Sequence, residues 1–535
     1  MLSYRKLAMR VLGRPLHTEG IDSPRPASQR AAAFILTAAM LTTLAAPAFA
    51  DIWHIENGDI TISAGESGNN VTQNNNTTYG DTNTIITNQN KDTASSHTVT
   101  IEAKDKDDKV EVTLKDVNID TSSRNKAAVS VTGEGDTNIK LDGDNALKSD
   151  IYRSGIYGSG SLTISGGEND SLTAQGGSGA NGISSSGSLT ISGGTVTANG
   201  DDGGRGISSS GSVTISGGST VTANGGSGTI SGGDGIWSGG GVTISGGSTV
   251  TANGGNGGSL VGGDGIRSGG GLTVSDGTVT AKGGNGDSKD GYGGDGIRSG
   301  GVVTISGNTV NAAGGYGGKV GGYGICSFDR VAISGGTVEA AGGNGSTGGG
   351  SGIYSSVIDL SGSLELTAKA GSPNGKALSQ KGSELVLDTI KDKLGPGAKV
   401  TATDADGKVI DQVSTPRPVE PEESSSSSDG GSAAPSAPAS PLPGLTVTDK
   451  DGPRISYTST QSGNTLTVCV GRLTASFRIS LAALRQLRAE GIETITFQTI
   501  LCSTTLSVDE LLAMGGEDAE AVLTHRFTDS SLTVG

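Results

Sequence analysis

The sequence predicts an all-β protein, a right-handed parallel β-helix of glycine-rich coils that is followed by a disordered linker and a small α+β domain. Three observations predict the helix: a Gly-Ile pair recurs every 24 to 31 residues, each interval holds three short segments with alternating apolar residues, and glycine pairs separate these segments. With 93 glycines and only 3% aromatic residues among 535, the chain cannot fill a core with large side chains. It must stack small β-branched residues instead.

The Gly-Ile pair marks eight coils, whose isoleucines are Ile156, Ile183, Ile207, Ile236, Ile266, Ile297, Ile325 and Ile353. One coil of three strands cannot bury its own aliphatic face, so successive coils must stack. The stretch GGDGIRSGGGLTVSDGTVTAKGG, residues 262–284, is then one coil, with Ile266, Leu272, Val274 and Val279 in the core. Its glycines stand at corners, where a positive φ or a close backbone approach excludes other residues.

A serine follows two positions after most of these isoleucines, on the inward side of the strand. The members of this serine row are Ser185, Ser209, Ser238, Ser268, Ser299, Ser327 and Ser355, and Gly158 interrupts it. We expect these buried hydroxyls to form hydrogen bonds along the rod, which is a structural role.

Composition divides the chain into six parts. Residues 1–50 predict a signal peptide, 51–150 an N-terminal cap with irregular first coils, 151–370 the regular repeats and 371–411 the closing coils. Residues 412–444 are a Pro/Ser-rich linker, typical of disorder. Residues 445–535 predict a small α+β module, with a helix that Ser480 caps and Gly491 stops.

The first fifty residues carry a basic leader, the apolar run AAAFILTAAMLTTLAA and the pattern APAFA. This order is typical of a secretory signal peptide cleaved after Ala50, and the run is short for a membrane span. Cleavage leaves 32 basic and 52 acidic residues, a net charge of −20. We therefore expect a secreted protein, associated with the cell surface, that binds no nucleic acid and inserts in no membrane.

Cysteine and histidine offer little chemistry. Cys326, Cys469 and Cys502 show no CxxC spacing for zinc, and only Cys469 and Cys502 are a candidate disulfide pair. Histidines outside the leader, at 54, 97 and 525, form no cluster in the sequence. The sequence therefore predicts no catalytic residues.

Three successive coils place an aspartate two residues before the Gly-Ile isoleucine: Asp234, Asp264 and Asp295. Stacked like charges repel unless something neutralises them. Calcium is one candidate, since it prefers carboxylate and carbonyl oxygens, and these aspartates are the predicted metal ligands. The alternative is internal pairing, because Arg267 and Arg298 each follow an aspartate by three residues.

Trp237 shares a column with Arg267 and Arg298, and Tyr157 and Tyr354 stand in the end coils of this column. An exposed aromatic ring can stack on a sugar, and arginines can pair with uronate carboxylates. Trp237, Arg267 and Arg298 are therefore the predicted carbohydrate-binding residues. The alternative is that Trp237 only stacks on Arg267 as a cation-π pair.

The segments TLKDVNID, NIKLDGDNAL and GIYGSGSLTISGG, with the repeated pattern GIxSGGxVTISGGTVTA, resemble secreted clostridial-type carbohydrate-binding-domain proteins. These are parallel β-helices whose architecture is related to that of pectate lyases, and the resemblance covers residues 51–370. It implies that the protein binds polysaccharide outside the cell, that this polysaccharide is acidic, and that calcium assists the binding. The sequence differs from typical sugar-binding proteins in one respect, because it has few aromatic residues on which a sugar ring could stack.

Three function classes follow from these observations. We predict a secreted, non-catalytic β-helix protein that binds carbohydrate or mediates adhesion. One alternative is a calcium-dependent polysaccharide lyase that acts on acidic glycans, with the aspartate column and an arginine base as its site. The other is a purely structural repeat scaffold, because regular repetition is what a scaffold needs.

Overall fold

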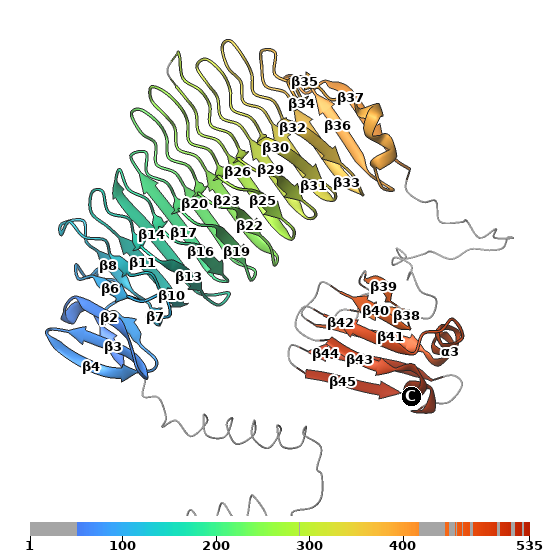
Figure 1. The fold of residues 1–535 in the computed structure, drawn as a ribbon, viewed down its shortest axis with the longest axis horizontal. Helices are drawn as coiled ribbons and strands as arrows, with labels where there is room; N and C mark the ends of the chain where they lie inside the picture. Colours follow the sequence, from blue (N-terminus) through green and yellow to red (C-terminus); the bar gives the residue numbers. More distant parts are fainter. Residues whose placement is uncertain are drawn as a thin grey trace, which may run out of the picture. The chain divides into compact units, whose positions relative to one another are not determined.

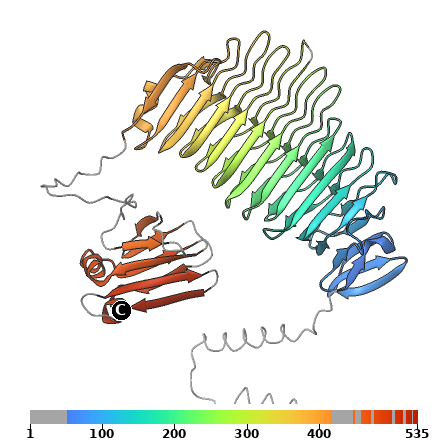
Figure 2. The same ribbon diagram turned by 180° about the vertical axis from the view of Figure 1, so that it is seen from behind.

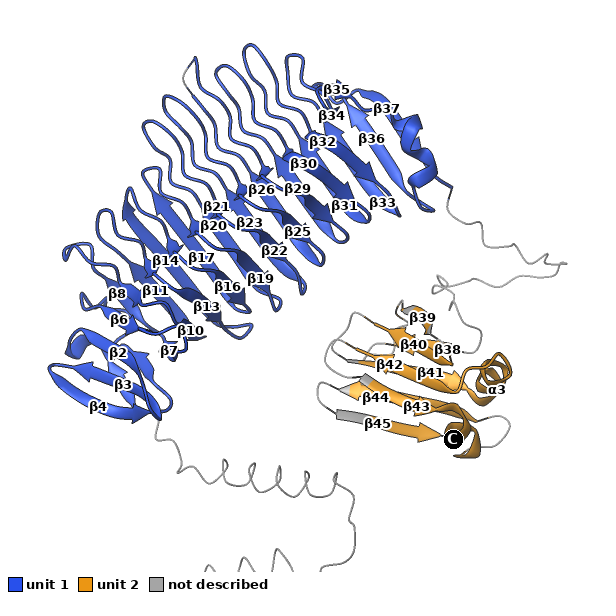
Figure 3. Cartoon of the chain, viewed as in Figure 1, with its two compact units in different colours: residues 1–421 blue, residues 422–535 orange. Residues whose placement is uncertain are grey.

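The computed structural model describes residues 51–287, 289–416, 445–448, 455, 457–462, 464–470, 474–499, 503–514, 519–526 and 529–534. The chain forms two compact units, residues 1–421 and residues 422–535 (Figure 3). The predicted signal peptide, residues 417–444 of the predicted linker, and Cys502 lie outside the described residues. The boundary between the units falls within the predicted linker.

The first unit is a parallel β-solenoid of about 13 turns, as the repeat predicts (Figure 1). Each regular coil contributes one strand to each of three faces, and every strand pairs in parallel with its equivalent in the next coil. Figure 2 shows the stacked coils from behind. The register is continuous, since Ile266 pairs with Ile236 on one side and with Ile297 on the other.

The strands of each face follow in chain order. The first face holds β2 (Ile60–Gly65), β6 (Val99–Glu102), β9 (Val129–Thr132), β12 (Ile156–Gly158), β15 (Ile183–Ser185), β18 (Ile207–Ser209), β21 (Ile236–Ser238), β24 (Ile266–Ser268), β27 (Ile297–Ser299), β30 (Ile325–Ile333), β32 (Ile353–Leu360) and β34 (Leu378–Gln380). The second face shares β30 and β32 and adds β1 (Ile52–His54), β5 (Ile85–Thr87), β7 (Lys109–Lys115), β10 (Asp136–Asp142), β13 (Ser161–Ser165), β16 (Leu189–Ser192), β19 (Val213–Ser216), β22 (Val242–Ile244), β25 (Leu272–Val274) and β28 (Val303–Ile305). The third face holds β8 (Asn118–Asp120), β11 (Asp144–Lys148), β14 (Ser171–Ser178), β17 (Thr195–Asp201), β20 (Thr220–Asn224), β23 (Ser248–Asn253), β26 (Gly277–Lys282), β29 (Thr309–Ala313), β31 (Gly336–Ala341), β33 (Leu364–Lys369), β36 (Lys399–Thr403) and β37 (Val409–Ser414).

The core is a set of aliphatic columns, one for each inward position of the three faces. In the coil of residues 262–284, Ile266, Leu272, Val274 and Val279 are fully buried, as predicted. Burial of a Val, Leu or Ile side chain stabilises a fold by roughly 1.5 to 3 kcal/mol. Repeated over successive coils, this contribution replaces the aromatic core that the composition lacks.

The serine row is structural, as predicted, but its partners are backbone carbonyls of the preceding coil. The hydroxyl of Ser238 donates to the Gly211 carbonyl at 2.8 Å, and that of Ser299 donates to the Gly270 carbonyl at 2.8 Å. Both side chains are fully buried. A buried hydroxyl must find such a partner, so the row fixes one coil on the next without a ligand.

The glycine pairs do two different jobs. Those between the second and third strands, such as Gly217 and Gly218, have positive φ and make the predicted corners. Those after the third strand run through long loops that project from one side of the solenoid (Figure 1). Here the glycines of neighbouring loop segments bind each other: the Gly255 amide donates to the Gly233 carbonyl at 2.8 Å, and the Gly263 amide donates to the Gly255 carbonyl at 2.8 Å.

This pattern continues as an unbroken glycine row, in which each amide donates to the carbonyl of the preceding member at 2.7–3.0 Å. Its members are Gly204, Gly226, Gly233, Gly255, Gly263, Gly284, Gly294, Gly315, Gly322, Gly343, Gly350 and Gly371. A Cβ atom on Gly255 would lie 2.1 Å from the Gly226 oxygen. Only glycine fits, because the loop backbones approach too closely for any side chain.

Both ends of the solenoid carry irregular elements. At the start, β2, β3 (Gly68–Gln73) and β4 (Asn76–Asp81) form an antiparallel sheet, and η1 (Ile55–Asn57) precedes it. At the end, β37 turns back antiparallel to β36, while β35 (Ser383–Glu384) pairs with β34 and leads into η2 (Leu387–Lys393). These elements cover edges that would otherwise pair with another chain.

The second unit has the predicted α+β fold. One sheet holds β38 (Leu445–Thr448), β41 (Thr474–Ser480), β44 (Glu520–Arg526) and β45 (Asp529–Val534), and the other holds β39 (Thr458–Ser462), β40 (Thr465–Cys469), β42 (Thr494–Gln498) and β43 (Ser503–Ser507). The helices are α3 (Leu481–Ala489) and α4 (Val508–Met514). The Ser480 side chain accepts from the Ala483 amide, which confirms the predicted N-cap.

Substitution in the glycine row tests its close packing. We expect Gly255→Ala to lower the free energy of unfolding of the solenoid by about 1–3 kcal/mol, the usual cost of overpacking. Gly348→Ala is the matched control from another loop, because its Cβ would meet only Val320 side-chain atoms at 3.8 Å. Chemical denaturation followed by circular dichroism measures both, and equal stability of the two variants would contradict this account.

Candidate functional site

A groove of about 840 Å³ lies between the first face and the glycine-rich loops. We call it the aspartate groove, and its lining includes Gly179, Asn181, Arg205, Asp234, Asp264, Arg267, Tyr292, Asp295, Arg298 and Tyr323. The coil register brings these residues together, because each aspartate precedes its Gly-Ile pair and each arginine on β24 and β27 follows it. Five of the six predicted site residues therefore line one groove.

The three aspartates form a hydrogen-bonded row that runs along the groove. An Oδ1 atom of Asp234 accepts from the Asp264 amide at 2.9 Å, and Oδ1 of Asp264 accepts from the Asp295 amide at 2.7 Å. The row ends where Oδ1 of Asp295 accepts from the Tyr323 amide at 2.7 Å. All three residues are buried, with only 4–6% of their surface exposed. One oxygen of each carboxylate therefore holds the next coil in register.

Arginines neutralise two of the three carboxylates. Arg298 lies 3.2 Å from Asp295 Oδ2, which confirms one predicted pairing. Asp234 instead pairs with Arg205 of the preceding coil, also at 3.2 Å, a partner that sequence reasoning missed. The signal was present, since Arg205 itself occupies the aspartate position of its own coil in GGRGI.

The predicted stacking of Trp237 on Arg267 is wrong. The guanidinium over the Trp237 ring is that of Arg205, at 4.4 Å from the ring centroid. The reason is Ser208, a small residue that pairs in register with Trp237. Its size leaves room for the Arg205 side chain, which lies 3.5 Å from Ser208 Oγ and extends over the indole ring. One face of Trp237 is thus occupied by protein.

Asp264 and Arg267 do not form the predicted ion pair. Within the described residues, neither has an oppositely charged side-chain partner at 4 Å or less. Asp264 uses one oxygen for the Asp295 amide, and Arg267 is exposed. The centre of the groove therefore presents one carboxylate oxygen and one guanidinium that the protein itself does not pair.

Burial sets the protonation of the row. It raises the pKa of the Asp264 carboxyl well above its usual range, and the charges of Asp295 and Asp234 add to this rise. Burial also raises the pKa of Asp295 to about 6, although the Tyr323 amide and Arg298 oppose it. The groove therefore becomes more positive as the pH falls toward 6 and below.

Calcium finds few free oxygens in this row. A calcium ion takes six to eight oxygen ligands, whereas Asp234 and Asp295 each bind an arginine and all three aspartates bind a backbone amide. In the described part of the chain, no group of three or more His, Cys, Asp or Glu side chains is arranged to hold a metal ion. The donor set does not fit calcium, and calcium binding stays a prediction of the sequence.

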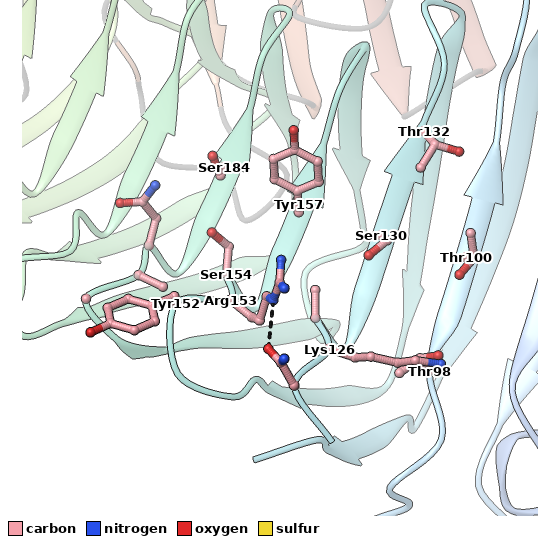
Figure 4. Close-up of a pocket in the computed structure, with 15 residues that line it drawn as sticks. Thr98, Thr100, Lys126, Ser130, Thr132, Tyr152, Arg153, Ser154, Tyr157 and Ser184 are labelled. Carbon is pink, nitrogen blue, oxygen red and sulfur yellow. Dashed lines mark hydrogen bonds between the residues drawn. The ribbon is translucent and has the colours of Figure 1, made fainter. Parts of the chain in front are cut away.

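A second groove, of about 750 Å³, lies on the same face nearer the N-terminus (Figure 4). We call it the hydroxyl groove, because Thr98, Thr100, Ser130, Thr132, Ser154 and Ser184 line it together with Lys126, Tyr152, Arg153 and Tyr157. No acidic residue belongs to its lining. Sequence reasoning missed this site, since Thr98 to Thr132 come from the irregular first coils, and Tyr152, Arg153 and Ser154 precede the first Gly-Ile pair and match no repeated motif.

An ion cluster stands at the N-terminal end of the hydroxyl groove. Asp59 accepts from Arg124, Lys126 and the Thr98 amide at 2.7–3.1 Å, and these contacts hold its pKa far below the usual range despite partial burial. His97 lies 3.1 Å from the same carboxylate. One acid shared by two permanent cations leaves a net positive charge beside Lys126.

No family model, curated protein or solved structure matches this chain. The fold and grooves define a parallel β-solenoid protein with two polar grooves along one face. The solenoid is consistent with the pectate-lyase-like architecture that the sequence resemblance implies. Among the described residues, no helix is long and apolar enough to cross a bilayer.

Replacement of Asp264 by its neutral isostere tests the cost of the buried carboxylate. A raised pKa means that the folded state holds its proton more tightly, so stability is lost as the pH rises from about 4 through the folded pKa. We expect Asp264→Asn to be more stable than the wild type at pH 7.5, and this gap to narrow at pH 4.5. Asp107→Asn, at an exposed position, is the charge control, and thermal melting at both pH values measures the effect.

Thermal melting also tests the calcium prediction. A cation that binds only the folded state raises the melting temperature. From the donor set, we expect the curves in CaCl₂ and EDTA to coincide. A rise that is specific to calcium, absent with MgCl₂ and lost in Asp264→Asn, would restore the calcium site.

Proposed function

We propose that the solenoid binds an extended acidic polysaccharide along its grooved face, as a secreted and non-catalytic surface protein. The charge of this face carries the proposal. The grooves are lined by five basic side chains against three acidic ones, while the whole chain has a net charge of −16. The basic excess lies in the hydroxyl groove, because the aspartate groove holds three arginines and three aspartates. Grooves with this balance favour an anionic ligand, which the acidic remainder of the protein repels.

Arginine geometry supports an acidic sugar in particular. Arg267 and Arg298 stand in register on β24 and β27, and strands of neighbouring coils lie about 4.8 Å apart. This spacing is close to the length of one pyranose unit in an extended chain. A guanidinium can donate two parallel hydrogen bonds to a uronate carboxylate, a group that a neutral sugar lacks.

Aromatic residues are few but lie where a sugar chain would pass. Tyr292 lines the aspartate groove and is 43% exposed, and Lys319 lies 5.5 Å from its ring centroid. Tyr323 lines the same groove and stacks on Tyr354 at 4.9 Å between centroids. Such rings offer apolar faces to sugar C–H groups while their hydroxyls stay in water.

Calorimetry with polygalacturonate and a neutral glucan tests the proposal. We expect binding of the acidic polymer alone, weakened by salt because exposed charges are screened. Arg267→Ala should lower the affinity about three- to tenfold, since one exposed guanidinium is lost. Arg330→Ala is the control, because Arg330 is half exposed and lies outside both grooves.

The same samples separate the other function classes. Absence of binding to any glycan would leave a scaffold or a protein adhesin. Growth of absorbance from unsaturated uronate products, lost in Asp264→Ala, would identify a lyase instead. Export itself is tested by expression of the full chain and N-terminal sequencing of the mature protein, which we expect to begin at Asp51.

A further inference from the structure

We infer that the hydroxyl groove and the aspartate groove form one continuous binding path, which takes a single long acidic polysaccharide chain rather than a short oligosaccharide. This inference rests on the proposed function and names the length and course of the ligand. The hydroxyl groove thereby becomes a binding segment in its own right. It supplies a different chemistry from the aspartate groove.

The two grooves share lining residues. Gly179 and Asn181 line both, so the two hollows adjoin at this coil. The strand register also runs through the junction, since Tyr157 pairs with Ser184, and Ser184 with Ser208. A chain that follows this column passes from one groove into the other without a change of face.

Tyr152 marks the junction. Its ring packs against Gly179, where an added Cβ would lie 2.9 Å from ring atom Cε1. The residue has a φ of +58° and is 78% exposed. A bulky residue in the left-handed region is strained, and such strain is typical of functional positions.

The length of the path fits a polymer. The hydroxyl groove extends over four coils, from Thr98 to Asn181, and the aspartate groove continues over five more, from Arg205 to Tyr323. At about 4.8 Å per coil, the nine coils span on the order of 40 Å. An extended chain with one sugar per coil would need about nine residues to fill it.

The hydroxyl groove suits the same ligand by a second chemistry. Arg153 is exposed, its Nε donates only to Asn125 Oδ1 at 3.4 Å, and it has no ion pair within the described residues (Figure 4). Tyr157 is 43% exposed and stands among serine and threonine hydroxyls. These groups can bind a uronate carboxylate and sugar hydroxyls with no carboxylate opposing them.

One chain across both segments binds more tightly than two short chains. Once the aspartate groove holds part of the polymer, the remainder is presented to the hydroxyl groove at a high effective concentration. Affinity should therefore rise steeply with chain length until the path is full. Further sugars should add little beyond that length.

Calorimetry with oligogalacturonates of three, six and twelve residues tests the inference. We expect the dodecamer to bind at least tenfold more tightly than the hexamer, with one dodecamer per protein. Arg153→Ala combined with Tyr157→Ala should reduce dodecamer affinity to about that of the hexamer. Arg330→Ala combined with Tyr79→Ala is the control, because both side chains are exposed and lie outside the grooves.

The outcomes separate this inference from the proposed function. If the hexamer binds as tightly as the dodecamer and the double variant at Arg153 and Tyr157 has no effect, the continuous path is wrong. In that case a loss of binding in Arg267→Ala still supports an acidic glycan in the aspartate groove. If no oligomer binds, both proposals fail. Circular dichroism of each variant confirms that the solenoid stays folded.

Discussion

Close contact between the backbones of successive coils is the constraint on which this structure depends. Strands, serine row, aspartate row and glycine row all place a hydrogen bond between one coil and the next. The serine and aspartate rows and the close packing of the glycine row require the same residue type at the same step of successive coils, whereas the strand bonds join backbone groups of any residue. The repeat in the sequence is therefore a record of these contacts, and the low aromatic content follows because small side chains stack without voids.

The aspartate row shows how one residue type can serve this constraint and chemistry together. One carboxylate oxygen of Asp264 holds the Asp295 amide, while the other belongs to the groove. Arginines from the same coil or from the preceding one neutralise its neighbours. The protein thus tolerates three buried acids in a row, and the proposed ligand meets a surface whose charge is set mainly by arginine.

Much of the fold could be predicted from the sequence because its period is local and strict. Ile266 and its equivalents, the inward serines and the aspartate column all follow from the alignment of coils. The pairing of Asp234 with Arg205 could not, because a long side chain reaches a neighbouring coil in a direction that spacing does not encode. The hydroxyl groove was missed for another reason: Tyr152 and Arg153 stand before the first Gly-Ile pair and match no repeated motif, and only the fold brings them beside Thr98 and Ser184.

The glycine row has a consequence for how such a protein can change. Side chains are excluded where the loop segments run together, as at Gly255 and Gly263, but not at the loop tips, where Leu260 and Tyr316 are exposed. We therefore expect substitutions to be tolerated at the loop tips and in the columns that face the groove, and not in the glycine row. Duplication of a whole coil would preserve every contact between coils and lengthen the groove by one coil. The length of the groove can therefore change in evolution in steps of one repeat.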